Sequence, residues 1–259
     1  MILDEIAERT RQRVAEEKSA APLSEMKNRA LAMDANTGFP FKKALGGDDI
    51  SFICEVKRAS PSKGLIAEDF PYLEIARDYE SAGASAISCL TEPFWFKGKD
   101  EYLTEIARAV NIPVLRKDFT VDEYMIYQAK TLGASAVLLI CSILSKEQLA
   151  EYLEIAHSLG LSALVEAHDE DEVGTALSVG AGIIGVNNRD LRTFTVDIHN
   201  SARLRKLVPP EVLFVSESGI RTAADVAALR DNGTNAVLIG ETLMRSPDKK
   251  AALAELRGH

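Results

Sequence analysis

Charged and polar side chains follow five short apolar runs in this 259-residue chain. They are Glu55 and Lys57, Lys117, Glu166, Asn187 and Arg189, and Glu217 and Ser218. A lysine beside carboxylates can act as an acid toward a carbonyl oxygen, or as a Schiff-base nucleophile if its pKa is lowered, and a nearby glutamate supplies the base. Charge at the end of a buried strand is costly unless it lies in a wet or ligand-filled cleft. Five such runs in series therefore predict strands that meet at one polar site.

The structural alternative is a network of ion pairs that closes the end of a barrel and binds no ligand. For a single residue such as Glu55, this interpretation has about equal weight. It is weaker for five strand ends together, because buried ion pairs add little to stability.

An alternation of strands and helices, repeated eight times, positions these residues. Short apolar runs bounded by turn residues indicate buried strands. The predicted strands span residues 52–57, 86–90, 114–117, 136–140, 163–166, 183–187, 213–217 and 236–239. The predicted helices span residues 72–82, 100–110, 122–132, 146–159, 170–179, 200–207, 223–231 and 247–256. Four near-copies of one helix-to-strand joint, at 82–86, 132–136, 159–163 and 232–236, place glycine where a helix needs a left-handed cap.

Repeated joints of one design predict right-handed βα units, and eight units over residues 51–257 predict a (β/α)8 TIM barrel. Residues 1–47 form a helical extension, and we expect one domain over residues 1–259. The alternative is a doubly wound sheet, for which residues 180–185 supply a literal GxGxxG. A dinucleotide site needs that motif after a strand and before a helix. Here the glycines end a helix and enter a strand, so we reject a nucleotide site.

Side-chain parity places the charged residues inside the barrel. Residues two apart on a strand share a face, so Ile53, Glu55 and Lys57 point one way, and the intervening apolar residues face the helices. The same parity groups Lys117 with Phe119. Barrel enzymes hold their sites at the carboxyl ends of the strands. We therefore expect these groups around one cavity at that end.

Glycines after the last two strands indicate a phosphate site. Gly219 follows the seventh strand and Gly240 the eighth, and glycine lets main-chain amides approach a ligand closely. In TIM barrels a phosphate commonly binds there, at the N-terminus of a short extra helix. The main-chain amide of Glu241 fits such a site if its carboxylate turns away.

Two other segments each allow two interpretations, and one histidine allows one. The loop 58–64 after the first strand is either a lid that bears Ser60 and Lys63 or a solvated connector. The aromatic cluster 94–96 either lines a pocket for an aromatic ligand or packs against the N-terminal extension. His168 has the parity of Glu166 but lies beyond it, so we expect it at the surface.

The composition limits the classes of partner that the protein can bind. A formal charge of −9 and a pI near 5.1 argue against nucleic acid and anionic membranes, which favour positive surfaces. The three cysteines lie in apolar runs without CxxC spacing, which predicts buried core thiols. The four histidines lack metal-ligand spacing. We therefore expect no metal and no cofactor. The start of the chain is too acidic for a signal peptide, and no 18-residue apolar span occurs. We expect a cytoplasmic enzyme, monomeric or a weak homodimer, with a small anionic substrate.

Several motifs together resemble one family. They are residues 55–64 (EVKRASPSKG), 115–119 (LRKDF), 164–166 (LVE), 185–191 (GVNNRDL) and 216–220 (SESGI). In these motifs the chain is similar to indole-3-glycerol phosphate synthase of tryptophan biosynthesis, from the N-terminal helices to the last helix. The resemblance implies a phosphate-binding (β/α)8 barrel. It also implies closure of the indole ring of 1-(2-carboxyphenylamino)-1-deoxyribulose 5-phosphate, with loss of CO2 and water.

The resemblance also implies roles. Lys117 is similar to the family's general acid, which protonates the ketone oxygen, and Glu166 to the carboxylate that acts as base in rearomatisation and dehydration. Lys57 and Glu55 match a second acid and its supporting carboxylate, with Asn187 and Glu217 in the same polar ring. The substrate-binding positions are Ser60 and Arg189 near the substrate carboxylate, Phe96, Phe119 and Leu191 around the aromatic ring, and Ser218, Gly219, Gly240 and Glu241 at the phosphate.

Three rival functions remain. A phosphoribosylanthranilate isomerase relies on a Cys and an Asp as its acid–base pair, and neither occupies the expected strand ends. A Schiff-base aldolase would use Lys117 as a nucleophile. A barrel that only binds phosphate metabolites gains nothing from unsatisfied carboxylates, so the acid–base set argues against it.

Overall fold

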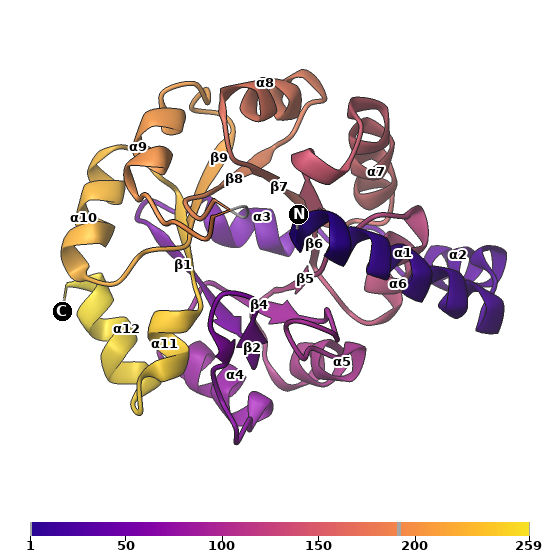
Figure 1. The fold of residues 1–259 in the computed structure, drawn as a ribbon, viewed down its shortest axis with the longest axis horizontal. Coiled ribbons are helices and arrows are strands. Elements are labelled where there is room, and N and C mark those ends of the chain that lie inside the picture. The colour runs from indigo at the N-terminus through magenta and orange to yellow at the C-terminus, as the bar shows by residue number, and fades with distance from the viewer. Residues whose placement is uncertain (1, 191–192, 259) are drawn as a thin grey trace.

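A closed barrel of eight parallel strands forms the centre of the protein in a computed structural model, which describes residues 2–190 and 193–258. The strand order is β1-β10-β9-β8-β7-β6-β5-β4, with β1 paired to both β10 and β4 (Figure 1). The barrel strands are β1 (Ser51–Val56), β4 (Ala86–Leu90), β5 (Val114–Lys117), β6 (Ala136–Ile140), β7 (Ser162–Ala167), β8 (Ile183–Asn187), β9 (Leu213–Glu217) and β10 (Ala236–Ile239). The predicted TIM barrel is confirmed.

Helices surround the barrel and precede it. Outside the strands lie α4 (Tyr72–Ser81), α5 (Asp100–Ala109), α6 (Glu123–Thr131), α7 (Lys146–Ser158), α8 (Glu170–Ser178), α9 (His199–Arg205), α10 (Ala223–Asp231) and α12 (Lys249–Arg257). Two short helices, η1 (Cys141–Ile143) and α11 (Glu241–Arg245), follow β6 and β10. Before β1 lie α1 (Ile2–Ala20), α2 (Leu23–Leu31) and α3 (Pro40–Leu45). Among the described residues, no helix has the length and hydropathy needed to cross a membrane.

Two apolar layers hold the barrel together, as the parity of β1 predicts. Ile53 belongs to the interior layer, whereas Phe52 and Cys54 pack in the outer layer between strands and helices. Burying these side chains stabilises the fold by roughly 1.5–3 kcal/mol each. The strand ends are therefore fixed, and so are the side chains that they carry.

The three N-terminal helices pack at three different places on the barrel. The start of α1 lies over the carboxyl ends of the strands, near the middle of the view in Figure 1. Helix α2 contacts α6 outside the barrel. Helix α3, which was not predicted, begins at Pro40 and buries Phe41 and Leu45 against the interior layer. These two residues are four apart and so share one helix face.

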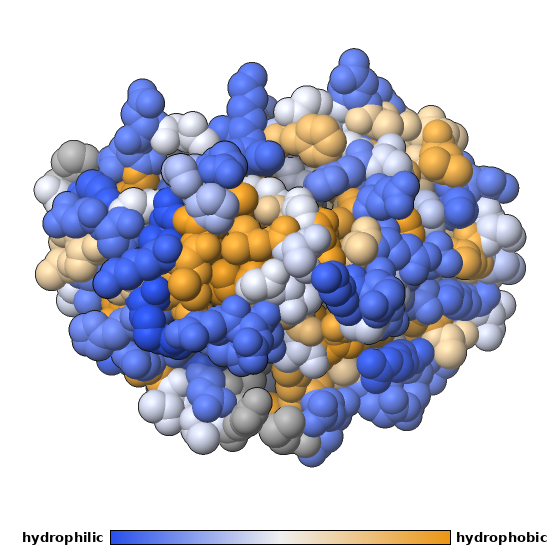
Figure 2. Space-filling model, turned by 90° about the horizontal axis from the view of Figure 1, so that it is seen from above, coloured by the Kyte–Doolittle hydropathy of each residue, from blue (hydrophilic) through white to orange (hydrophobic). Residues whose placement is uncertain are grey.

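The loop after β1 contains a small hairpin that was not predicted. Strands β2 (Ala59–Ser60) and β3 (Gly64–Leu65) pair antiparallel, and Ser60 is buried whereas Leu65 is exposed. The loop thus has local structure of its own. Figure 2 shows the face along the top of Figure 1, where charged and polar residues surround a smaller apolar area.

Candidate active site

The carboxyl ends of the strands enclose one cavity of about 370 Å³. Every predicted site residue that the structure describes lines it: Glu55, Lys57, Ser60, Phe96, Lys117, Phe119, Glu166, Asn187, Arg189, Glu217, Ser218, Gly219, Gly240 and Glu241. Leu191 lies outside the described residues. The expectation that distant strand ends meet at one site is therefore met. Its chemistry depends on how these groups face one another.

Lys117 lies at the centre of the polar groups. Its Nζ is 3.2 Å from Glu166 Oε2 and 3.7 Å from Glu217 Oε2, and both carboxylates are 2% exposed. Burial alone would lower the pKa of Lys117, but the charges of Glu166, Glu217 and Glu55 outweigh it and raise this pKa. The site therefore holds Lys117 as a cation with a proton to donate.

The two carboxylates beside Lys117 differ in charge. Burial opposes ionisation of Glu166, yet Lys117 and His168 lower its pKa. Burial and the neighbouring Glu166 raise the pKa of Glu217 to about 8, despite the nearby Lys117. Two like charges this close do not both ionise easily. At neutral pH the site thus favours an ionised Glu166 and a protonated Glu217.

A second ion pair lies on β1 and just beyond it. Lys57 Nζ donates to Glu55 Oε1, and both side chains are largely buried. A Cβ at Gly240 would come within 2.8 Å of Lys57 Nζ, so a larger residue at this position would displace the ion pair. Gly240 thereby has a steric role at the end of β10, in addition to the opening that it gives to main-chain amides.

The loops after β9 and β10 form the polar end of the cavity. Gly219 has φ +82°, a conformation that favours glycine, and α11 begins directly after Gly240. The Glu241 carboxylate turns to Arg245, 3.0 Å away, which is the orientation required if its amide is to face an anion. Arg221 and Arg245 also line the cavity, and neither was predicted. Their position shortly after Gly219 and Gly240 could have identified them as residues of this cavity.

Aromatic rings form the apolar side. The Phe96 and Phe119 ring centroids are 6.0 Å apart. The buried Glu92 carboxylate accepts hydrogen bonds from the main-chain amides of residues 94, 95 and 96, at 2.8–2.9 Å, and so fixes this loop. Phe94 instead packs under Arg9 of α1, 4.4 Å from its ring centroid. Within the aromatic cluster, Phe96 therefore lines the cavity and Phe94 packs against the N-terminal extension.

The N-terminal helix contributes to the same wall. Ile2, Leu3 and Ile6 line the cavity, and Ile6 belongs to the interior layer. Sequence reasoning placed these residues in an extension and missed their part in the site. Charged neighbours such as Asp4 and Glu5 obscured the apolar face.

Asn187 and Arg189 form the side of the cavity next to Glu166. Asn187 Nδ2 donates to Glu166 Oε1 at 3.3 Å, and its Oδ1 accepts from the Arg189 amide at 3.0 Å. The Arg189 guanidinium donates to the Phe194 carbonyl at 3.3 Å. Asn187 thus links the carboxylate to the loop that carries Arg189.

His168 does not lie at the surface, so that prediction is wrong. Its side chain is 20% exposed, with Nε2 3.5 Å from Glu166 Oε1 and Nδ1 3.1 Å from Glu172 Oε2. The parity argument was sound, but β7 runs to Ala167, one residue further than predicted. The additional residue keeps His168 beside Glu166.

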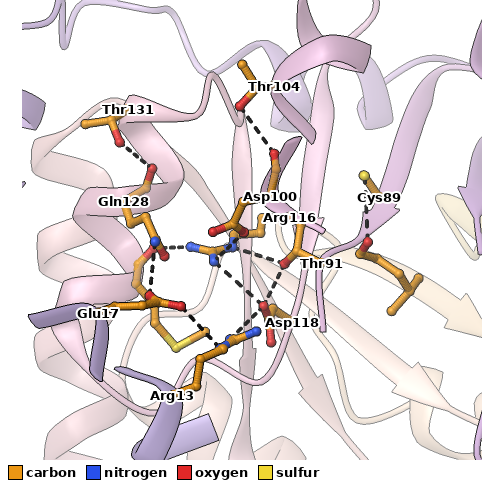
Figure 3. Close-up of polar contacts among 12 residues, drawn as sticks. Arg13, Glu17, Cys89, Thr91, Asp100, Thr104, Arg116, Asp118, Gln128 and Thr131 are labelled. Atoms are coloured by element: carbon orange, nitrogen blue, oxygen red, sulfur yellow. Dashed lines mark hydrogen bonds and ion pairs between the residues drawn. The ribbon is translucent and has the colours of Figure 1, made fainter. Parts of the chain in front are cut away.

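A buried polar cluster supports the other face of β5 (Figure 3). Arg13 Nη2 of α1 is 2.9 Å from Asp118 Oδ2, which also accepts from Thr91 at 2.6 Å. Arg116, 2% exposed, pairs with Asp100 at 2.9 Å. Burial raises the pKa of Asp118, but Arg13 and Arg116 lower it below its usual value. The cluster ties α1 and α5 to the residues on either side of Lys117.

Similarity to known proteins agrees with this geometry. The family model for indole-3-glycerol phosphate synthase matches residues 3–256. An indole-3-glycerol phosphate synthase of Ruminiclostridium cellulolyticum is 58% identical over 258 residues, covering 100% of this chain and 99% of that protein. One from Endomicrobium trichonymphae is 55% identical, covering 99% of this chain and 100% of the relative.

Solved structures show the fold alone. A mutant tryptophan synthase alpha-subunit of Pyrococcus furiosus has a TM-score of 0.63 at 18% identity, covering 82% of this chain and 99% of its own. A 3-hexulose-6-phosphate synthase has a TM-score of 0.62 at 19% identity, with coverages of 81% and 99%. Family match, full-length relatives and barrel agree: the chain belongs to the indole-3-glycerol phosphate synthase family.

Proposed function

We propose that this chain closes the indole ring of 1-(2-carboxyphenylamino)-1-deoxyribulose 5-phosphate, giving indole-3-glycerol phosphate, CO2 and water. This is the carboxy-lyase reaction of its family, in tryptophan biosynthesis. One observation carries the assignment of roles: Lys117 Nζ lies 3.2 Å from the ionised Glu166, in a cavity with one apolar and one cationic side.

Lys117 acts as the general acid in ring closure. The aromatic carbon that bears the carboxylate attacks the ketone carbon, and the ketone oxygen takes the Lys117 proton as its π bond breaks. The raised pKa of Lys117 keeps that proton in place at neutral pH. The C–CO2 bond then breaks, and its electrons return to the ring system, where the iminium accepts them.

Glu166 acts as the base in the later steps. Loss of CO2 makes the benzene ring aromatic again; Glu166 then takes a proton from the CH2 carbon of the new five-membered ring, and the hydroxyl group on the neighbouring carbon leaves as water to complete the indole. Lys57, paired with Glu55, lies on the same cavity and serves as the second acid for the departing hydroxyl. Asn187 orients Glu166, and Glu217 completes the polar ring.

The two sides of the cavity bind different parts of the substrate. Phe96 and Phe119 form the slot for the aromatic ring, and Ser60 and Arg189 face the substrate carboxylate. The amides of Gly219, Gly240 and Glu241, with Ser218 nearby, bind the phosphate at the start of α11. Leu191 stays a predicted wall residue outside the described part of the chain.

The charge of Lys117 argues against the aldolase alternative. A Schiff-base lysine must be neutral to attack, which requires a lowered pKa, whereas this pKa is raised. Borohydride added with substrate should therefore leave Lys117 unmodified. Reductive trapping of the substrate on Lys117 would instead favour the aldolase.

Activity of two variants tests the roles. Lys117→Met removes the acid, so indole fluorescence should appear at least about a hundredfold more slowly on mixing with substrate. Glu166→Gln should lower kcat much more than it changes KM. Lys146→Met, at an exposed position on α7, is the matched control. Near-native turnover of the Lys117 variant contradicts the assignment.

The remaining expectations stay predictions. We propose a single domain, a monomer or weak homodimer, a cytoplasmic location, and no binding of nucleic acid or membranes. The acidic composition supports the last of these. Size-exclusion chromatography with light scattering measures the oligomeric state directly.

A further inference from the structure

A histidine that the proposed reaction does not use lies beside its base. His168 follows Glu166 by two residues at the end of β7, and its Nε2 is 3.5 Å from Glu166 Oε1. That nitrogen is buried and has no hydrogen-bond partner among the described residues. A buried polar atom of this kind needs an explanation.

Glu172 of α8 fixes the orientation of the ring. Its Oε2 accepts the His168 main-chain N–H at 2.8 Å and lies 3.1 Å from Nδ1. With Nδ1 turned to Glu172, Nε2 lies on the side of Glu166, at ion-pair distance from Oε1 but without a hydrogen bond to it. Glu166 accepts hydrogen bonds from Lys117 at Oε2 and from Asn187 at Oε1, and His168 adds its charge on the Oε1 side.

The charges around His168 favour its protonated form. Burial lowers the pKa of His168, but its hydrogen bond to Glu172 and the charges of Glu166, Glu172 and Glu217 raise it overall. On its other side His168 borders a second cavity of about 580 Å³. The other charged residues that line this cavity are Asp4, Asp169, Arg189, Asp190, Asp197 and Arg203.

We propose that His168 is a positioning residue for Glu166: held by Glu172, it keeps the Glu166 carboxylate ionised and turned toward Lys117 until that carboxylate accepts a proton. The inference rests on the proposed role of Glu166 as base. It gives Glu172, which does not line the catalytic cavity, a function at a distance from the reacting atoms.

Steady-state kinetics over a range of pH test the proposal. His168→Gln keeps a hydrogen-bond donor but cannot carry charge, and His168→Phe removes both. We expect kcat/KM to fall about tenfold in the Gln variant and further in the Phe variant, with the loss mainly in kcat. The acidic limb of both profiles should move to higher pH, because Glu166 loses a cation that lowers its pKa. A purely structural role would not move that limb.

His199→Gln is the matched control, because His199 is exposed at the start of α9. Thermal melting confirms that each variant is folded at the assay temperature, and the Gln variant alone decides the test if the Phe variant is not. An acidic limb that coincides with the control, or kcat/KM within about twofold of native, overturns the proposal. If those results accompany an inactive Glu166→Gln variant, only the His168 inference fails. If Glu166→Gln is itself active, the proposed function fails first.

Discussion

At the scale of single residues, the site separates two carboxylates that lie around one lysine. Glu166 has the partners that stabilise its charge, whereas Glu217 Oε1 has no hydrogen-bond partner among the described residues. A buried carboxyl without such partners favours the neutral form. The position of hydrogen-bond donors, and not burial alone, therefore decides which carboxyl group is ionised.

The charge of Glu217 gives a prediction about stability. Its pKa is raised in the folded protein to about 8, so between the unfolded value of 4.5 and 8 the folded state binds more protons. Stability should fall as pH rises through this range, by at most about 1.4 kcal/mol per pH unit. Glu217→Gln removes that dependence. Urea unfolding of the native and variant proteins from pH 5 to 9 measures the free energy of unfolding as a function of pH. If this free energy changes with pH in the same way in both proteins, the raised pKa of Glu217 is contradicted.

At the scale of elements, α1 joins the site to the outside of the barrel. Ile6 faces the cavity, and Arg13, two turns further along the same helix face, pairs with Asp118 next to Lys117. Lys18 adds a second tie to Asp122 at the start of α6. The N-terminal helix is thus held at one end so that its other end forms a wall of the site.

Removing the Arg13 charge should loosen this helix. Arg13→Met leaves Asp118 with Arg116, Thr91 and the Phe119 main-chain N–H, and we expect the free energy of unfolding to fall by about 2 kcal/mol. Arg11→Met, which breaks an exposed pair with Glu8 on the same helix, should cost less than about 1 kcal/mol. Chemical denaturation measures the free energy of unfolding of both variants. Equal losses would mean that the buried pair has no special role.

The elements show what the sequence could and could not predict. The strand ends at Lys117, Asn187 and Glu217 were predictable, because apolar runs and glycine joints have strict periods. Helix α3 was not, since its two buried residues, Phe41 and Leu45, are covered only by a barrel that forms far along the chain. The same holds for Ile6 and His168, whose burial depends on contacts with other elements.

At the scale of the whole molecule, the proposed phosphate site depends on the last two strands and α11. An anion that binds only the folded state stabilises it in proportion to the logarithm of its concentration. We therefore expect inorganic phosphate to raise the melting temperature with dose, gaining about 2.7 kcal/mol at one hundred times its Kd. Chloride at equal ionic strength is the control for screening. Identical melting curves in the two salts would contradict a phosphate site.

The pairing of β1 with β10 has a consequence for biosynthesis. During translation β1 emerges early, yet its partner, residues 236–239, is made only near the end of the chain. Until then β1 and β9 each present an unpaired edge, the kind of surface on which nascent chains associate wrongly. A nascent chain of this protein thus carries an open, inactive sheet until β10 has been made and can pair with β1.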